Sequence, residues 1–379
     1  MTSWQAHRLP SGATITLTNV PGAAASVAVS WSLGYRDETW PDQGGLAHLR
    51  EHLTFRASAR SADLEDEVLA EGGTVNGYTR RDLTVVHADG YGLDLPPLLG
   101  LAAEWLRGNH TDAWVSIQRD VVREEIREKT GDRPESFYPW AHVGRCLWEG
   151  YALGHDGWAT APEGPALARR VRQFRKMYTA DRLTVAVAWD HRGGPSPDAV
   201  LATLADAVAA VPVSRSPTLR PAEAVRRRPC SPSLALLTDT EHGHRGPPAF
   251  AGVLPSALPL TTVLAVEAFL RAEAATGAIA YGHVGEYGNP LEIADPITVV
   301  IGPGTRSLAA RGAVRLELDR LLHGLTAVRN GPAAARTGAV RAAVTASRDP
   351  RVDTRADWSA ELATARELMS TMALVPVHA

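Results

Sequence analysis

The chain has 379 residues, of which 45% are hydrophobic and 21% charged, an ordinary composition for a globular protein of about two domains. A formal net charge of −3 gives no sign of a nucleic-acid partner. The two cysteines, Cys146 and Cys230, match no metal or redox spacing, which argues against a disulfide framework and favours a reducing compartment.

The N-terminal residues lack the basic start and apolar run of a signal peptide. No apolar stretch approaches the roughly 20 residues that a membrane-spanning helix needs. We therefore expect a soluble, cytoplasmic protein.

The pattern of apolar residues predicts alternating strands and helices in the first 212 residues. Strands are expected at 13–19, 25–32, 74–79, 83–88 and 183–189. Helices are expected at 44–57, 63–71, 97–107, 112–129, 166–178 and 198–211.

A linker is expected at 213–232, because 212–232 holds five prolines and the basic run Arg226–Arg228. We interpret that run as solvated linker and not as a nucleic-acid patch. The linker would separate a domain at 1–212 from a second αβ domain at 233–379. In the second domain, strands are expected at 234–237 and 297–301, and helices at 260–275, 308–325 and 358–369.

A metal-binding motif, His48-Leu49-Arg50-Glu51-His52, falls in the first expected helix. Residues four apart share a helical face, so the two imidazoles can take adjacent corners of a zinc tetrahedron. Glu51 lies on the same side and can reach a water at the metal without being a ligand. This order, His-x-x-Glu-His, is that of the inverzincins. The alternative is a solvated face that holds two histidines, and the apolar neighbours argue against it: Leu46, Leu49, Leu53 and Phe55.

A third ligand is expected on the helix at 112–129, because catalytic zinc usually has three protein ligands and one open position. Gln118 and Glu125 are seven residues apart and share a face. Three apolar residues predict that this face points inward: Trp114, Ile117 and Val121. Glu124 points away from it and Glu128 lies near the end of the helix, so Glu125 is the preferred ligand. The alternative is that Glu125 lies at the edge of the stripe and reaches solvent.

A second histidine pair, His242 and His244, lies in a loop rich in glycine and proline with no third ligand nearby. We interpret this pair as part of a solvated loop.

Several segments of the first half resemble the pitrilysin/insulinase family of zinc metallopeptidases, including its mitochondrial-processing-peptidase branch. They are 34–38 with 45–48, 72–79 with Asp82, 118–125, and 174–189. The resemblance implies an α+β fold of two related domains, each a mostly antiparallel sheet packed with helices, which together form one half of a clam. It also implies that Zn²⁺ is held by His48, His52 and Glu125, and that Glu51 activates the attacking water.

Two residues of these segments carry further expectations. Gln118 stands where the family often has a glutamate near the third ligand; glutamine can donate a hydrogen bond but cannot take up charge. Asn76 lies in a segment that resembles the family's substrate-binding edge strand, where it would hold the peptide backbone. The alternative for Asn76 is a polar residue beside a turn.

The second half departs from the family's pattern. Members that work alone carry an arginine and a tyrosine that hold the substrate across the cleft. Residues 272–305 contain no arginine, and neither Tyr281 nor Tyr287 can be matched to the family's tyrosine. The second half is also shorter than the family's. In this respect the chain resembles metal-bearing subunits whose related partner supplies the arginine and tyrosine.

The expected function is that of a zinc-dependent endopeptidase, which cleaves peptides or small precursor proteins as the metal-bearing subunit of a heterodimer. One alternative is a non-catalytic binding or scaffold subunit, which the loss of a ligand or of Glu51 would favour. Another is a structural zinc protein, which usually needs a fourth protein ligand.

Overall fold

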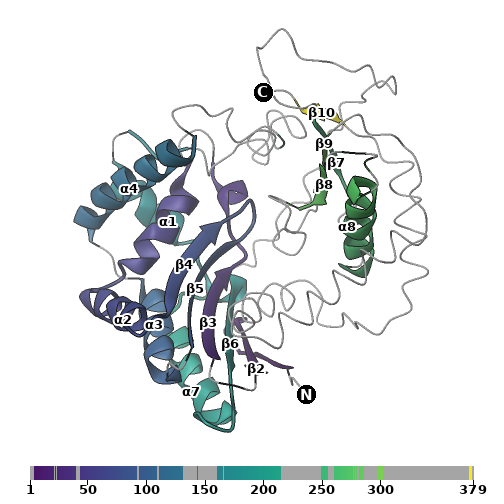
Figure 1. Ribbon diagram of the computed structural model, residues 1–379. Helices are drawn as coiled ribbons and strands as arrows, with labels where there is room; N and C mark the ends of the chain where they lie inside the picture. Colours follow the sequence, from purple (N-terminus) through teal and green to yellow (C-terminus); the bar gives the residue numbers. More distant parts are fainter. Residues whose placement is uncertain are drawn as a thin grey trace.

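The computed structural model of the chain has a mixed α+β fold with two separate sheets (Figure 1). The residues it describes are 4–20, 22, 24–39, 43–91, 94–108, 111–130, 143, 160–164, 166–214, 249–254, 260–275, 277, 279, 281–285, 297–301 and 375–377. None of the described helices is both long and apolar enough to span a lipid bilayer.

The first sheet has six strands in the order β1-β2-β6-β3-β5-β4. All neighbours are antiparallel except β2 and β6, which run parallel. The strands are β1 (Trp4–Arg8), β2 (Thr14–Asn19), β3 (Ala24–Trp31), β4 (Thr74–Thr79), β5 (Thr84–Tyr91) and β6 (Leu183–Trp189). Since β4 ends this order, one of its edges is free of any other described strand.

Helices cover one face of this sheet (Figure 1). They are α1 (Leu46–Phe55), α2 (Ala59–Ala70), α3 (Leu95–Arg107), α4 (Asp112–Thr130), α6 (Leu167–Arg175) and α7 (Pro197–Ala209). Two turns of 3₁₀ helix lie at Tyr35–Asp37 and Ala180–Arg182. Helix α3 packs on β3, and α1 packs on β4 and β5 and also contacts α4.

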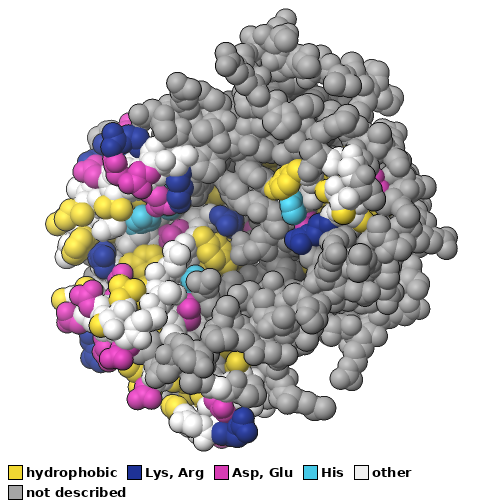
Figure 2. Space-filling model, in the orientation of Figure 1, with side chains coloured by type: hydrophobic (Ala, Val, Ile, Leu, Met, Phe, Trp, Pro, Cys, Tyr) yellow, Lys and Arg dark blue, Asp and Glu magenta, His cyan; other side chains and the backbone are white. Residues whose placement is uncertain are grey.

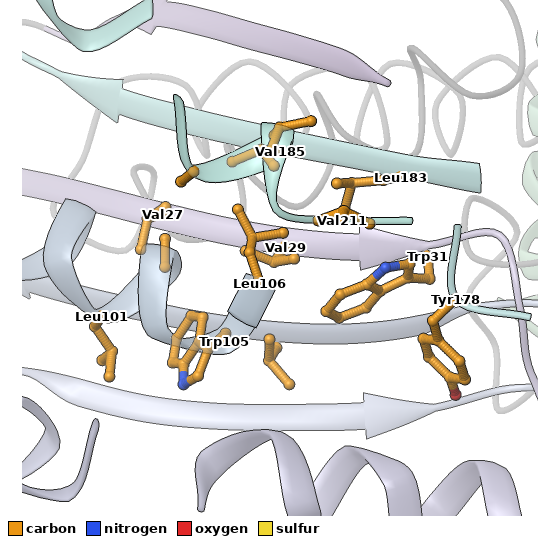
Figure 3. Packing of buried hydrophobic residues seen from close by; sticks show 14 of the residues in the cluster. Val27, Val29, Trp31, Leu101, Trp105, Leu106, Tyr178, Leu183, Val185 and Val211 are labelled. Carbon is orange, nitrogen blue, oxygen red and sulfur yellow. The ribbon is translucent and has the colours of Figure 1, made fainter. Parts of the chain in front are cut away.

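Alternate residues of the central strands form the core with the helices (Figure 3). Val27, Val29 and Trp31 of β3 point to the helical side, as the period of two in a strand requires. Trp105 of α3 is fully buried, and its ring meets that of Phe55 edge to face, with centroids 5.9 Å apart. This contact joins the end of α1, at Phe55, to α3, which itself packs on β3.

The start of α1 depends on Gly45 and Glu38. Gly45 has a φ of 78°, in the left-handed region. The Glu38 carboxylate accepts hydrogen bonds from the backbone N–H groups of Gly45 (3.0 Å) and Ala47 (2.7 Å). Glu38 thereby supplies acceptors that the first turn of a helix lacks. A Cβ atom on Gly45 would lie 2.0 Å from the carbonyl oxygen of Thr160.

We expect Gly45→Ala to lower the free energy of unfolding more than Gly72→Ala does. Gly72 has a nearly identical φ of 77°, but a Cβ atom there meets nothing within 4 Å. Gly72→Ala therefore costs backbone strain alone, about 1–3 kcal/mol, and Gly45→Ala adds a collision with backbone. Urea unfolding of both variants measures the difference; equal losses would contradict the described approach of Gly45 to Thr160.

The second sheet has four antiparallel strands in the order β10-β7-β9-β8. Its strands are β7 (Ala249–Val253), β8 (Tyr281–Val284), β9 (Ile297–Ile301) and β10 (Val375–Val377), and helix α8 (Leu260–Ala275) packs against β8. The α+β fold class expected from the sequence is confirmed. The proposed boundaries at 212 and 233 stay a prediction.

Most described elements lie where the sequence predicted them. Helix α2 begins at Ala59 and not at residue 63, because the Ser58 hydroxyl accepts a hydrogen bond from the backbone N–H of Ser61 and caps the helix there. Strands β1, β7, β8 and β10 were not predicted. The strand expected at 234–237 and the helices at 308–325 and 358–369 lie outside the described residues.

Candidate metal centre

Two histidines of α1 place their Nε2 atoms together. His48 and His52 are four residues apart, and these atoms are 3.2 Å apart. His48 is buried and the side chain of His52 is 15% exposed. Several polar side chains of α1 are buried, among them those of His48, Arg50 and Glu51.

Glu125 of α4 approaches the same point. Its Oε2 atom lies 3.1 Å from Nε2 of His52 and 3.5 Å from Nε2 of His48. In a tetrahedral zinc site with metal–ligand distances of about 2.0–2.2 Å, neighbouring ligand atoms lie about 3.3–3.6 Å apart. The three separations are close to this range, so two imidazoles and one carboxylate fit three corners of such a site. Among the described residues, this is the group of histidine, cysteine and acidic side chains that could hold a metal ion.

The apolar stripe of α4 that points inward differs from the predicted stripe. Three residues expected inside are exposed: Trp114 (37%), Ile117 (50%) and Val121 (44%). Val115, Gln118 and Val122 are buried in their place, so the predicted stripe is wrong by about one residue of helical phase. The reason is that Val115 and Val122, seven residues apart, pack into the main core. Glu125, three residues after Val122, then reaches the histidines from the flank of this face.

The neighbouring carboxylates of α4 are engaged or exposed elsewhere. Glu124 is exposed and pairs with Arg127, and Glu128 is exposed. The other oxygen of Glu125, Oε1, pairs with Lys129 one turn further along the helix. Figure 2 shows this region as a corner where histidine, acidic and basic side chains gather over α1 and α4.

The charges of Glu125 and His52 depend on each other. Hydrogen bonds to His48 and His52 hold the pKa of Glu125 well below its usual range, so this carboxylate is ionised at neutral pH. Burial alone would lower the pKa of His52, but the hydrogen bond to Glu125 and the charges of Glu51 and Glu125 outweigh burial and raise it. The centre is therefore electronegative and suited to a cation.

Glu51 lies beside this group without belonging to it. Its side chain is buried, and its Oε2 atom accepts a hydrogen bond of 2.7 Å from the hydroxyl of Thr79 on β4. The group that could hold a metal ion contains His48, His52 and Glu125 but not Glu51. This position suits proton transfer next to a metal better than ligation.

Arg50, inside the motif, points to the opposite side of α1. Its guanidinium is buried 5.2 Å over the ring of Tyr178 and donates a 2.6 Å hydrogen bond to the Thr54 hydroxyl. Burial lowers the pKa of Arg50 to about 10. The ring of Tyr178 and the hydroxyl of Thr54 thus hold Arg50 on the side of α1 that faces away from the histidines.

Gln118 and Asn76 take different places relative to the centre. Gln118 is buried and contacts His52, whose pKa this contact helps to raise. Asn76 is exposed, and its Oδ1 atom accepts a hydrogen bond of 2.8 Å from the backbone N–H of Gly77. Because side chains alternate along a strand and Thr79 faces Glu51, the side chain of Asn76 points to the other face of the sheet.

Sequence reasoning missed Thr79 and Glu38. The period of two in the expected strand at 74–79 already places Thr79 and Gly77 on the same face, and this was the available signal for Thr79. Glu38 carried no such signal, because it caps α1 from a preceding turn. His242, His244 and Tyr287 lie outside the described residues.

Residues 14–136, which include the whole centre, match the family model described as insulinase, peptidase family M16. The resemblance of the first half of this chain to the insulinase family of peptidases is thereby confirmed.

Relatives by sequence include two uncharacterized zinc proteases. That of Streptomyces coelicolor is 32% identical over 187 residues, which are 48% of this chain and 40% of that protein. That of Mycobacterium tuberculosis is 33% identical over 193 residues, 49% of this chain and 43% of that protein. The β subunit of the mitochondrial-processing peptidase of Blastocladiella emersonii is 28% identical over 190 residues, 48% of this chain and 40% of that subunit. The matched stretch thus spans about two fifths of these relatives.

Solved structures of similar fold cover nearly the whole of this chain. A protease from Helicobacter pylori has a TM-score of 0.65 at 14% identity, with 98% of this chain and 97% of that chain covered. Pitrilysin has a TM-score of 0.59 at 15% identity, with 98% of this chain but 44% of that chain covered. This chain therefore has the fold of about one half of pitrilysin, as expected for half of a clam.

Proposed function

We propose that this chain is a zinc-dependent endopeptidase that cleaves peptides or small precursor proteins. The observation that carries the proposal is the convergence of two imidazole nitrogens and one carboxylate oxygen, 3.1–3.5 Å apart, with a separate buried carboxylate beside them. Zinc suits this donor set because it accepts nitrogen and oxygen ligands and tetrahedral geometry. The names of the zinc-protease relatives support the same metal and activity.

The residues around the centre have complementary roles in this proposal. Bound zinc would supply a Lewis acid that polarises the scissile carbonyl and makes water acidic near neutral pH. Glu51 takes a proton from the attacking water and later passes it to the leaving amine. His48, His52 and Glu125 hold the metal, and Gln118 orients His52 by its contact with that ring.

The substrate is proposed to add as a strand to the free edge of β4. This edge borders Glu51 through Gly77 and Thr79, and no other described strand pairs with it. Asn76 would hold the peptide backbone there. Its side chain already accepts a hydrogen bond from the Gly77 N–H, and a substrate carbonyl could replace that acceptor while the freed amide binds the peptide.

A related partner subunit is proposed to complete the substrate site. Residues 272–305 contain no arginine. Arg271 of α8 lies just before this range, but its Nε donates a 2.7 Å hydrogen bond to the fully buried Glu267. Glu267 also contacts His283 (2.8 Å) and accepts from the backbone N–H of Val284 (2.6 Å), so Arg271 is part of a local network. One relative is by name a β subunit of a processing peptidase.

A non-catalytic scaffold subunit is the alternative function. Gln118, in place of a carboxylate, is the feature of the site that favours it. The presence of all three metal-binding side chains and of Glu51 favours the enzyme.

Metal analysis combined with co-purification tests the proposed function. The purified chain is expected to hold one zinc ion, and full-rate cleavage of labelled casein is expected only together with a co-purified related subunit. Zinc binding without cleavage by either preparation would favour the scaffold. Full-rate cleavage by the chain alone, or by a homodimer, would contradict the partner.

A further inference from the structure

The hydrogen bond between Thr79 and Glu51 joins the edge strand to the motif helix. The Thr79 side chain is buried, and its hydroxyl donates to Oε2 of Glu51 over 2.7 Å. Threonine is branched at Cβ, so a strand restricts its χ1 angle and thereby the direction of its hydroxyl. A rigid donor on β4 therefore fixes one oxygen of a glutamate whose own side chain has three rotatable bonds.

Gly77, two residues earlier on the same face of β4, lies against the other oxygen. A Cβ atom on Gly77 would lie 3.0 Å from Oε1 of Glu51 and 3.0 Å from the ring of Phe55. These approaches are tighter than ordinary van der Waals contact, so a side chain at this position would press on the carboxylate. No described residue donates a hydrogen bond to Oε1, whereas Oε2 has Thr79.

We propose that Thr79 is a positioning residue for Glu51: its hydroxyl holds Oε2, so that Oε1 stays free above Gly77 as the atom that accepts the proton. The inference rests on the proposed function for its catalytic meaning. It concerns the two oxygens of one carboxylate, to which the family match assigns no separate roles. Proton transfer requires the acceptor within hydrogen-bond reach of the water, and prior orientation of the acceptor lowers the barrier.

Thr79→Val tests the hydroxyl with little change of shape, and Thr79→Ser restores it. Thr84→Val is the matched control. Thr84 is a buried threonine that faces Thr79 across the β4–β5 ladder, but its hydroxyl donates to the carbonyl oxygen of Leu33 (2.8 Å). Both valine variants thus remove one buried hydroxyl, and only one of these hydroxyls touches Glu51.

The activity assay uses labelled casein and the full chain with any subunit that co-purifies. We expect Thr79→Val to lower kcat about 10–100-fold, as loss of an orienting contact does, with KM within about twofold of the parent. Thr79→Ser is expected to recover most of kcat, and Thr84→Val to keep it. All variants should retain zinc. A Thr79→Val enzyme with parental kcat, or one no slower than Thr84→Val, would overturn the proposal.

A second measurement needs neither zinc nor activity. In the zinc-free chain, we expect Thr79→Val to lower Tm by about 3–6 °C, because a hydrogen bond to a charged group is lost. In a Glu51→Ala background the same substitution should change Tm by less than about 2 °C. If the Tm effect of Thr79→Val depended on Glu51 in this way but the chain cleaved nothing, the Thr79–Glu51 contact would be supported and the proposed peptidase function contradicted. Absence of coupling would overturn the positioning role even in an active enzyme.

Discussion

Glu51→Gln is expected to lower the rate of peptide cleavage by at least about 100-fold, within the 10²–10⁴-fold range of general acid–base catalysis. The amide has nearly the same shape as the carboxylate and can still accept the hydrogen bond of Thr79, but it cannot take up a proton at neutral pH. Since Glu51 is not among the three residues that converge on the metal site, zinc content should stay at one ion per chain. Hydrolysis of labelled casein and metal analysis of the same sample measure both effects.

Glu65→Gln is the control for charge removal near the motif helix. Glu65 is a partly buried carboxylate on α2 that pairs with Arg56, the residue after α1, over 2.8 Å. Its substitution should leave activity and zinc content near those of the parent. Retained cleavage in Glu51→Gln would contradict the role of Glu51 as proton acceptor. Loss of zinc in that variant would instead indicate that Glu51 is a metal ligand.

The helix that carries the two histidines of the candidate metal centre could be predicted because its pattern is local. His48 and His52 lie four residues apart, and helical geometry alone brings their rings to one side. The strands β4 and β6 were predicted to the residue for a related reason, since their boundaries lie where alternating or valine-rich runs meet turn residues.

The orientation of α4 could not be obtained from its apolar residues. Trp114, Ile117 and Val121 form the more hydrophobic stripe, but Val115 and Val122 enter the core. Apolar residues are common on protein surfaces, so the most apolar stripe of a helix need not be its buried one. Glu125 was correctly placed on the face of Gln118 because both follow the same seven-residue spacing. That face points inward because Val115 and Val122 pack in the core, and not because of the predicted apolar stripe.

Contacts between elements distant in sequence were the least predictable part of the site. Thr79 meets Glu51 across 28 positions, a contact that sequence reasoning missed. Glu125 meets His52 across 73 positions, and this contact was expected only with the help of the family resemblance. Such contacts depend on the register of β4 and on the packing of α4 against α1, which no local pattern specifies. The same limit explains why β1, β7, β8 and β10 were missed, since short strands gain their definition from the strands they pair with.

Glu125→Ala is expected to weaken zinc binding more than about 100-fold, because even residues behind the ligands cost 10–100-fold when they are replaced. The substitution removes the single described carboxylate oxygen that lies within 3.5 Å of both imidazole nitrogens. Two histidines on one helix would remain, which is one ligand fewer than catalytic zinc usually has. Competition titration with a chromophoric zinc chelator measures the loss, and cleavage should fall with zinc occupancy.

Glu124→Ala provides the matched control for this variant. It removes a carboxylate from the adjacent position of the same helix, with the same change in formal charge and helix propensity, but from a side chain that pairs with Arg127 and is exposed. Zinc affinity should then be within about twofold of the parent, since an exposed ion pair contributes little. If both variants lost zinc equally, net charge near α4 would explain the binding and Glu125 would have no special place. If neither did, the convergence of α4 on α1 would not form the metal centre, and the proposed hydrolysis would lose its basis.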